Sequence, residues 1–170
     1  MKLDEDMVVD VVDHSDKPIG VIPRGMVFHE HANFRVVHDL IFNSHGELLI
    51  QQIASARNRR HAGRWGSSVA AYIFAGESYE DAANRRLFQE LGLRTVSLRY
   101  IGKTSMIDEG CFKFIAVFAG TSDGPFTFDH AHIETLDFVP LSRLHELIDS
   151  EPRRFTPTFL KVLRFYESKM

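Results

Sequence analysis

The sequence has a single cysteine, Cys111, so no disulfide can form within the chain, and a reducing cytoplasm is the expected environment. No apolar run approaches the ~20 residues that a membrane-spanning helix needs. The acidic opening MKLDEDMVVDVVD lacks the basic-then-apolar order of a signal peptide. The formal net charge of -3 gives no bulk attraction to nucleic acids or acidic membranes. We therefore expect a cytoplasmic protein that binds neither nucleic acid nor membrane.

The length and the apolar content indicate a folded protein with a sizeable core. The chain has 170 residues, of which 44% are hydrophobic and 25% charged, and these values argue against global disorder. We find no internal repeat and no low-complexity linker. One domain over residues 1–170 is therefore expected.

Runs of aliphatic and β-branched residues predict a β-rich chain. Residues 7–13 and 18–22 flank a turn, and residues 35–43 and 47–53 flank another, so two hairpins are expected. Residues 54–66 are polar and basic and are predicted to form a loop. Further strands are predicted at 67–74, 95–105, 111–119 and 132–139.

Capping signals predict a central helix between Ser78 and Gly92. Ser78 is a suitable N-cap with Asp81 three residues later, and Gly92 is a suitable stop. Two more helices are expected at 142–149, capped by Ser142, and at 157–168. This order of elements predicts an α/β fold in which helices pack against a mixed sheet.

Residues 71–93 resemble the signature box of the Nudix superfamily, G-x5-E-x7-R-E-U-x-E-E-x-G-U, in which U is aliphatic. The resemblance extends to strands on both sides of the box and to a C-terminal helix, and so covers nearly the whole chain. It implies a Nudix fold, an α/β/α sandwich with a mixed central sheet. The box positions that match are Glu77, Arg85, Leu87, Glu90, Gly92 and Leu93.

Three positions of the box depart from the family pattern. Ala71 replaces the first glycine, Arg86 the first helical glutamate and Gln89 the second. The usual glutamates lie on one helix face, so here that face has zero formal charge instead of about −3. A guanidinium beside Glu90 repels a divalent cation at close range. The box therefore indicates the fold more strongly than it indicates hydrolysis.

Within the superfamily, three segments are similar to the branch that contains isopentenyl-diphosphate isomerases and related hydrolases. They are VVDVVDHSDKPIGVIPR, RVVHDLIFNSHGELLIQQ and GESYEDAANRRLFQELGL. The isomerase places a cysteine where this chain has Ala70 and a metal-binding histidine where it has Tyr72. Alanine has no proton to transfer, and a phenol is a poor metal ligand near neutral pH. We therefore expect no isomerase activity.

The resemblance implies MutT-like hydrolysis of a diphosphate-containing small molecule, assisted by magnesium (Mg2+) or manganese (Mn2+). Catalytic roles then fall to Glu90 and Gln89. Glu134, on the predicted late strand, is the favoured second metal ligand among the outlying acids; the others are Asp108, Glu109 and Asp129. Glu77 and Arg85 are expected to form an ion pair that fixes the loop against the helix, so with Gly92 they are structural.

Arginines near the box are the candidate substrate-binding residues, since their forked guanidinium groups match phosphate oxygens. A solvated basic loop is the alternative, and the lack of interleaved aromatics argues against nucleic acid. The substrate-binding candidates are Arg86, Arg24, Arg59, Arg60 and Arg64.

Two functions follow from these patterns. One is a hydrolase of nucleoside diphosphate derivatives or related pyrophosphates, with activity weakened by Arg86 and Gln89. The other is a catalytically impaired Nudix domain that acts as a ligand-binding module. The resemblance also leaves open a homodimer, since dimers are common in the superfamily.

Overall fold

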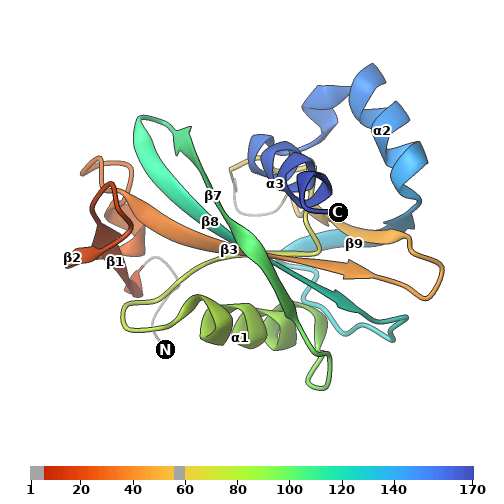
Figure 1. Cartoon of the computed structure of the whole chain (residues 1–170), viewed down its shortest axis with the longest axis horizontal. Coiled ribbons are helices and arrows are strands. Elements are labelled where there is room, and N and C mark those ends of the chain that lie inside the picture. The colour runs from red at the N-terminus through yellow and green to blue at the C-terminus, as the bar shows by residue number, and fades with distance from the viewer. Residues whose placement is uncertain (1–5, 56–59) are drawn as a thin grey trace.

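In the computed structural model, which describes residues 6–55 and 60–170, helices lie on both faces of a central mixed sheet (Figure 1). The strands are β1 (Val8–Val12), β2 (Pro18–Pro23), β3 (Phe34–Phe42), β4 (Leu48–Ile53), β5 (Trp65–Gly66), β6 (Val69–Tyr72), β7 (Arg99–Asp108), β8 (Cys111–Thr121) and β9 (Ile133–Val139). The helices are α1 (Tyr79–Leu91), α2 (Leu141–Ser150) and α3 (Pro157–Ser168), with short 3-10 turns η2 (Arg24–Met26) and η4 (Pro152–Arg154). The predicted α/β sandwich is confirmed.

The central sheet is built around β3 and β8, which run parallel to each other over the whole length of β3. β7 pairs antiparallel with β8, and β6 pairs antiparallel with β3. β4 pairs with β5 and with β9. The hairpin expected from residues 35–53 exists only at its turn, where Phe42 faces Leu48. Beyond that pair the two strands take different partners, because β3 is paired with β6 and β8 along its length.

Each face of the sheet packs against its own helices. On one face, Leu87 and Leu91 of α1 pack against Ile41 and Val69. On the other face, the buried side of α3, including Phe159, joins the core formed by alternate residues of β3 and β8, and Leu144 of α2 joins it too. Successive residues of a strand point to opposite faces, so neighbouring residues of β3 and β6 serve different sides of the sheet.

Local signals set the two ends of α1 as the sequence predicts. The hydroxyl of Ser78 accepts a hydrogen bond from the backbone N–H of Asp81 at 3.0 Å. Gly92 closes the helix in a left-handed conformation with φ of 72°, where a Cβ atom would also lie 3.1 Å from the side chain of Thr127. Both predicted caps are therefore confirmed.

Two local predictions are wrong. Ser142 does not cap α2, which begins at Leu141 with Pro140 at its N-cap and no side-chain cap. The proline fixes a φ that suits a helix start, so the helix begins one residue earlier than expected. The predicted loop 54–66 ends in strand structure, because Gly66 and Trp65 pair with Gln51 and Gln52 of β4.

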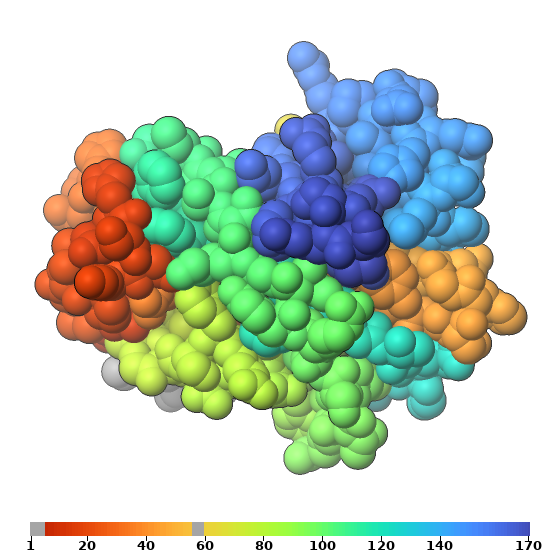
Figure 2. All heavy atoms as spheres, viewed as in Figure 1, coloured from red at the N-terminus to blue at the C-terminus, as the bar shows by residue number. Residues whose placement is uncertain are grey.

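The hairpin of β1 and β2 forms one end of the molecule (Figure 2) and is tied to the rest by Asp16. This buried carboxylate accepts from Arg35 Nε at 2.6 Å, from the hydroxyl of Tyr79 at 2.7 Å and from Lys103 Nζ at 2.7 Å. These residues belong to β3, α1 and β7. One side chain thus links the hairpin turn to three elements around the box.

In the described part of the chain, no helix has the length and apolar character required to cross a membrane.

Candidate functional site

The box begins with an ion pair that fixes the loop before α1. Arg85 Nε lies 2.7 Å from Glu77 Oε2, and Arg85 Nη2 lies 2.9 Å from Glu77 Oε1. Glu77 Oε1 also accepts from the backbone N–H of Phe74, and the Arg85 guanidinium lies 4.0 Å from the centre of the Phe74 ring. This paired geometry connects loop and helix, as the sequence predicts.

The helix face that carries metal ligands in the usual box is occupied by internal contacts here. Arg86 Nη2 lies 3.0 Å from Glu90 Oε2. The side-chain carbonyl oxygen of Gln89 accepts from Arg85 at 3.1 Å and from Arg86 at 3.3 Å. The other oxygen of Glu90 accepts from Gln51 Nε2 at 3.0 Å. Each oxygen that the box offers to a cation therefore already accepts hydrogen bonds.

A second acid, Asp39, is buried close to Glu90. It lies in the middle of β3 with no exposed surface, and neither of its carboxylate oxygens has a hydrogen-bond partner. Burial, together with the nearby Glu90 carboxylate, raises the pKa of Asp39 well above its usual value. An unpartnered buried carboxylate costs several kcal/mol when charged, so the protonated form is favoured at this position.

These residues do not fit a magnesium ion as they are placed. Magnesium needs a near-octahedral shell of oxygen ligands and usually keeps several waters. Arg86 already neutralises Glu90, and Asp39 is buried where water has no access. Within residues 6–55 and 60–170, no three His, Cys, Asp or Glu side chains gather into a group able to hold a metal. Glu134 is exposed on β9, at an irregularity in the pairing with β4.

Two of the five predicted substrate-binding residues lie on the α3 side of the sheet. The Arg24 guanidinium lies 4.6 Å from the centre of the Tyr72 ring, and the Arg60 guanidinium lies 4.8 Å from that of Phe28. Both rings pack against the core on this side. We call Arg24, Arg60 and Lys113 the basic cluster. Arg64 Nη1 lies 3.5 Å from His61 Nδ1, in the loop before β5. Arg59 lies outside the described residues, and Arg86 pairs with Glu90 on α1 instead.

Arg24 and Arg60 both act on the Tyr72 phenol. Burial raises the pKa of Tyr72, whereas the positive charges of Arg24 and Arg60 oppose that rise. Asp108 acts on the same phenol in the opposite direction. These charges therefore lie close enough to influence one another. They come from four segments, namely η2, the loop before β5, β6 and the end of β7.

Lys113 is the innermost cation of the basic cluster. Its ammonium group donates to Asp108 Oδ2 at 2.7 Å and to the hydroxyl of Thr158 on α3 at 2.6 Å. Asp108 also accepts from both terminal nitrogens of Arg60. Burial on its own raises the pKa of Asp108, but the hydrogen bonds and charges of Arg60 and Lys113 outweigh burial and lower that pKa to about 2. Asp108 is therefore negatively charged at any physiological pH.

The middle of β6 is open on this same side. Ala70 is exposed although its neighbour Val69 is fully buried and its pairing partner on β3 is the buried His38. His38 Nδ1 lies 2.7 Å from the hydroxyl of Ser67. Burial, with a smaller contribution from the Lys113 charge, lowers the pKa of His38 to about 3, so the imidazole is neutral near pH 7.

The sequence reasoning missed Asp39 and Lys113 as site residues. Each is a charged residue inside an apolar strand, in DLIF and FKFIAVF, and charged residues are seldom fully buried unless paired. The contrast between one charged side chain and its apolar neighbours is the signal in the sequence that could have identified both residues. Asp108 and Glu109 are candidate metal ligands by sequence, but Asp108 binds cationic side chains, and Glu109 Oε1 lies 3.6 Å from Arg60 Nη2.

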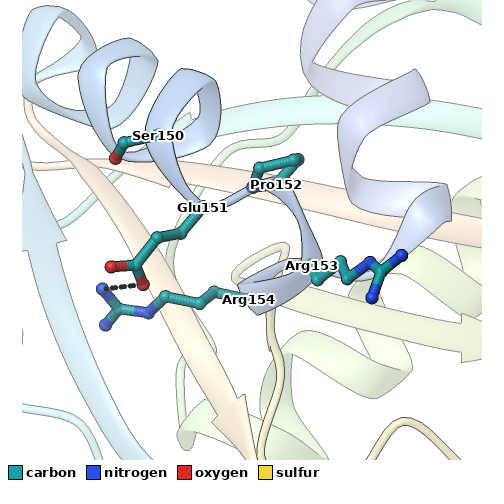
Figure 3. A pocket seen from close by; sticks show the side chains of 5 residues that line it. All are labelled: Ser150, Glu151, Pro152, Arg153 and Arg154. Carbon is teal, nitrogen blue, oxygen red and sulfur yellow. Dashed lines mark ion pairs between the residues drawn. The ribbon is translucent and has the colours of Figure 1, made fainter.

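A shallow hollow at the end of α2 is lined by residues of neither the box nor the basic cluster. It is lined by Ser150, Glu151, Pro152, Arg153 and Arg154 (Figure 3). Arg154 pairs with Glu151 at 3.3 Å, while Arg153 points away from that pair. Five consecutive residues without a second segment facing them do not enclose a ligand, so we assign no site there.

Comparisons with known proteins find a matching family model, relatives in sequence and solved structures of similar fold. A family model described as NUDIX domain matches residues 33–159. An uncharacterized Nudix hydrolase of Pseudomonas aeruginosa is 32% identical over 91% of this chain and 90% of its own length. An isopentenyl-diphosphate Delta-isomerase of Burkholderia multivorans is 30% identical over 88% of this chain and 86% of its own length. A crystal structure from Deinococcus radiodurans has a TM-score of 0.79 and 23% identity, covering 94% of this chain and 99% of the other.

Proposed function

Since the chain belongs to the Nudix family, we propose that it binds a diphosphate-containing small molecule, such as a nucleoside diphosphate derivative, through the basic cluster. The observation that supports this proposal is that Arg24, over the Tyr72 ring, and Arg60, over the Phe28 ring, lie on the same side of the sheet as the exposed Ala70. The two arginines come from separate segments, η2 and the loop before β5. A solvated basic loop, the alternative expected from sequence, needs no such arrangement.

The chemistry of the basic cluster suits a diphosphate. Guanidinium groups bind phosphate oxygens through paired N–H donors, and Arg60 keeps 42% of its side chain exposed. The aromatic faces of Tyr72 and Phe28 hold the two guanidinium groups by cation–π contacts, which reduces the entropy lost when a ligand binds. Fixed cations of this kind supply the charge that a divalent metal supplies in the usual box.

We further propose that hydrolysis is slow or absent. Hydrolysis in this family relies on a divalent cation to neutralise charge and activate water. On α1, Arg86 pairs with Glu90, and the side-chain oxygen of Gln89 already accepts hydrogen bonds from Arg85 and Arg86. Gln89 therefore offers no free oxygen beside Glu90 to complete a metal site. The proposed function is therefore that of a ligand-binding Nudix domain that retains the family's fold.

Magnesium-assisted hydrolysis is the second candidate, and one observation favours it. Glu90, the one helical box glutamate that remains, is held in place by a hydrogen bond from Gln51. In this case Glu90 would hold the metal with help from Gln89 and Glu134. Arg86 would first have to release Glu90.

Isomerase activity is not proposed, although relatives of 30% identity or less carry that name. The Ala70 side chain can neither donate nor accept a proton. The Tyr72 phenol lies under Arg24, and burial raises the pKa of Tyr72. A phenol that keeps its proton beside a cation is unsuited to bind a metal.

Calorimetric titration with ADP, paired with an assay of phosphate release, tests these proposals. Arg24→Gln and Arg60→Gln should each weaken ADP binding about tenfold or more, since each removes a charged contact to phosphate. Arg94→Gln is the matched control, because Arg94 lies over Phe88, a box-helix residue outside the basic cluster. Equal affinity in all four proteins would refute the basic cluster as the ligand site. Turnover lost on Glu90→Gln would favour the hydrolase.

A further inference from the structure

We propose that Asp108 is a resident anion of the basic cluster, which a phosphate group of the ligand displaces from Arg60. Asp108 would then hold Arg60 in place in the ligand-free protein. Because it competes for the same guanidinium, it would also lower the affinity for phosphate ligands. This inference rests on the proposed function, because it concerns how that same site receives its ligand.

The contacts of Asp108 are those that a phosphate would make. Both of its carboxylate oxygens accept from the terminal nitrogens of Arg60, one of them at 3.1 Å. Carboxylates and phosphates use this same paired arrangement with guanidinium groups. The terminal N–H groups of Arg60 that are best placed for a phosphate are therefore already bound to a carboxylate.

The two partners differ in their access to solvent. The side chain of Asp108 is only 10% exposed, whereas that of Arg60 is 42% exposed. A ligand can therefore approach Arg60 from its exposed side and compete with Asp108 for the guanidinium. A phosphate brings more negative charge than one carboxylate, so it competes well at a single cation.

Asp108 does not lose all its partners when Arg60 turns away. The buried ammonium of Lys113 still donates to Asp108 at 2.7 Å and to Thr158 at 2.6 Å. Removing both partners from a buried carboxylate would be costly, whereas the loss of Arg60 alone leaves Asp108 paired with the Lys113 charge. Lys113 thus allows the exchange by stabilising Asp108 in both states.

The geometry of the hairpin tip fits this exchange. Asp108 ends β7, and the chain turns through Glu109 and Gly110, both with positive φ, before β8 begins at Cys111. Arg60 connects the loop before β5 to this tip. Displacement of Asp108 therefore removes the paired hydrogen bonds between the two segments and leaves the longer contact of Arg60 with Glu109, at 3.6 Å.

The deciding experiment is a calorimetric titration of ADP into the wild type, Asp108→Asn and Glu109→Gln. Asp108→Asn should bind ADP about tenfold more tightly, because one competing charged contact is removed. Glu109→Gln removes the same charge 3.6 Å from Arg60, on a side chain that is 59% exposed. It should change the affinity about threefold or less, since exposed charges are strongly screened.

Equal or weaker binding by Asp108→Asn would overturn the inference while leaving the proposed function in place, because Asp108 would then be orienting Arg60. Absence of ADP binding by the wild type and by Asp108→Asn alike would overturn the proposed function itself. A measurement on the wild type covers the case in which Asp108→Asn does not fold. Saturating ADP should speed amide hydrogen exchange at residues 108–110, and slower or unchanged exchange there would overturn the inference.

Discussion

Arg86 and Glu90, one helical turn apart on α1, form an ion pair in which Nη2 and Oε2 are 3.0 Å apart. In a Nudix box of the usual composition, both positions are acidic and face a metal. Here one of them neutralises the other. The pair gives a physical reason for a family member to keep the fold of the box with an altered charge on the face that carries metal ligands in the usual box.

Restoring the acidic face should restore metal binding. The double variant Arg86→Glu, Gln89→Glu replaces a face of zero formal charge with three carboxylates at i, i+3 and i+4. We expect Mn2+ to bind at least about tenfold more tightly than to the wild type, as measured by the loss of free Mn2+ signal in electron paramagnetic resonance. Arg94→Glu reverses one charge outside this face, as Arg86→Glu does within it, and serves as the control. Equal Mn2+ affinity in the double variant and the wild type would show that the charge of this face does not limit metal binding.

The pair of Glu77 and Arg85 should contribute to stability rather than to ligand binding. Arg85→Ala removes a two-contact ion pair and should lower the free energy of unfolding by about 1–3 kcal/mol. Chemical denaturation of Arg85→Ala, Glu77→Ala and the double variant measures the coupling between the two side chains. If the two single losses simply add in the double variant, the pair is not a stabilising unit.

Within the N-terminal hairpin, substitution of Asp16 should lower the free energy of unfolding the most. Asp16→Ala leaves Arg35, Tyr79 and Lys103 without their shared acceptor, so we expect a loss of about 2–4 kcal/mol in the free energy of unfolding. Asp13, in the same turn, accepts from the backbone N–H groups of Ser15 and Lys17, so Asp13→Ala is the control and should cost less. Thermal unfolding of both variants tests this order, and an equal loss in the two would contradict it.

Asp39 should make stability depend on pH. Its pKa is raised in the folded state by burial and by Glu90, so the folded protein keeps a proton that the unfolded chain releases above about pH 4. The free energy of unfolding should therefore fall as the pH rises from about 4 toward the folded-state pKa. Asp39→Asn should remove this fall, so its stability relative to the wild type should improve with increasing pH.

Denaturant titrations of the wild type and Asp39→Asn at several pH values measure this difference. Asp137→Asn makes the same substitution at an exposed position of β9 and should leave the pH profile unchanged. A constant difference between the wild type and Asp39→Asn across the range would show that Asp39 does not hold its proton in the folded state.

The local features of this fold were predictable from the sequence, because short-range chemistry determines them. Ser78 and Gly92 cap α1 through bonds to residues within a few positions, and Glu77 pairs with Arg85 eight residues away. Ser142 failed as a cap because α2 already begins at Leu141, directly after Pro140. The brief pairing of β3 with β4 was not predictable, since it depends on which strands compete for β3.

The site itself was only partly predictable. Arginine composition indicated Arg24 and Arg60, but their placement on the same side of the sheet depends on contacts between distant segments. Lys113 and Asp39 stand out in sequence as charges inside apolar strands, yet their different outcomes follow from their neighbours. Lys113 has Asp108 and Thr158 as partners, whereas Asp39 has no hydrogen-bond partner and an acid nearby. The roles of Glu90, Gln89 and Glu134 in metal binding stay predictions.

Under the proposed function, fixed cations, and not a divalent metal, hold the ligand. The affinity of the wild type for ADP, measured by calorimetry in EDTA and again in excess Mg2+, distinguishes these two sources of positive charge. We expect ADP to bind in EDTA, and Mg2+ to leave the affinity unchanged or to weaken it by neutralising the phosphates. Binding that appears only with Mg2+ and is lost on Glu90→Gln would contradict this expectation and would show that the box still works through its metal.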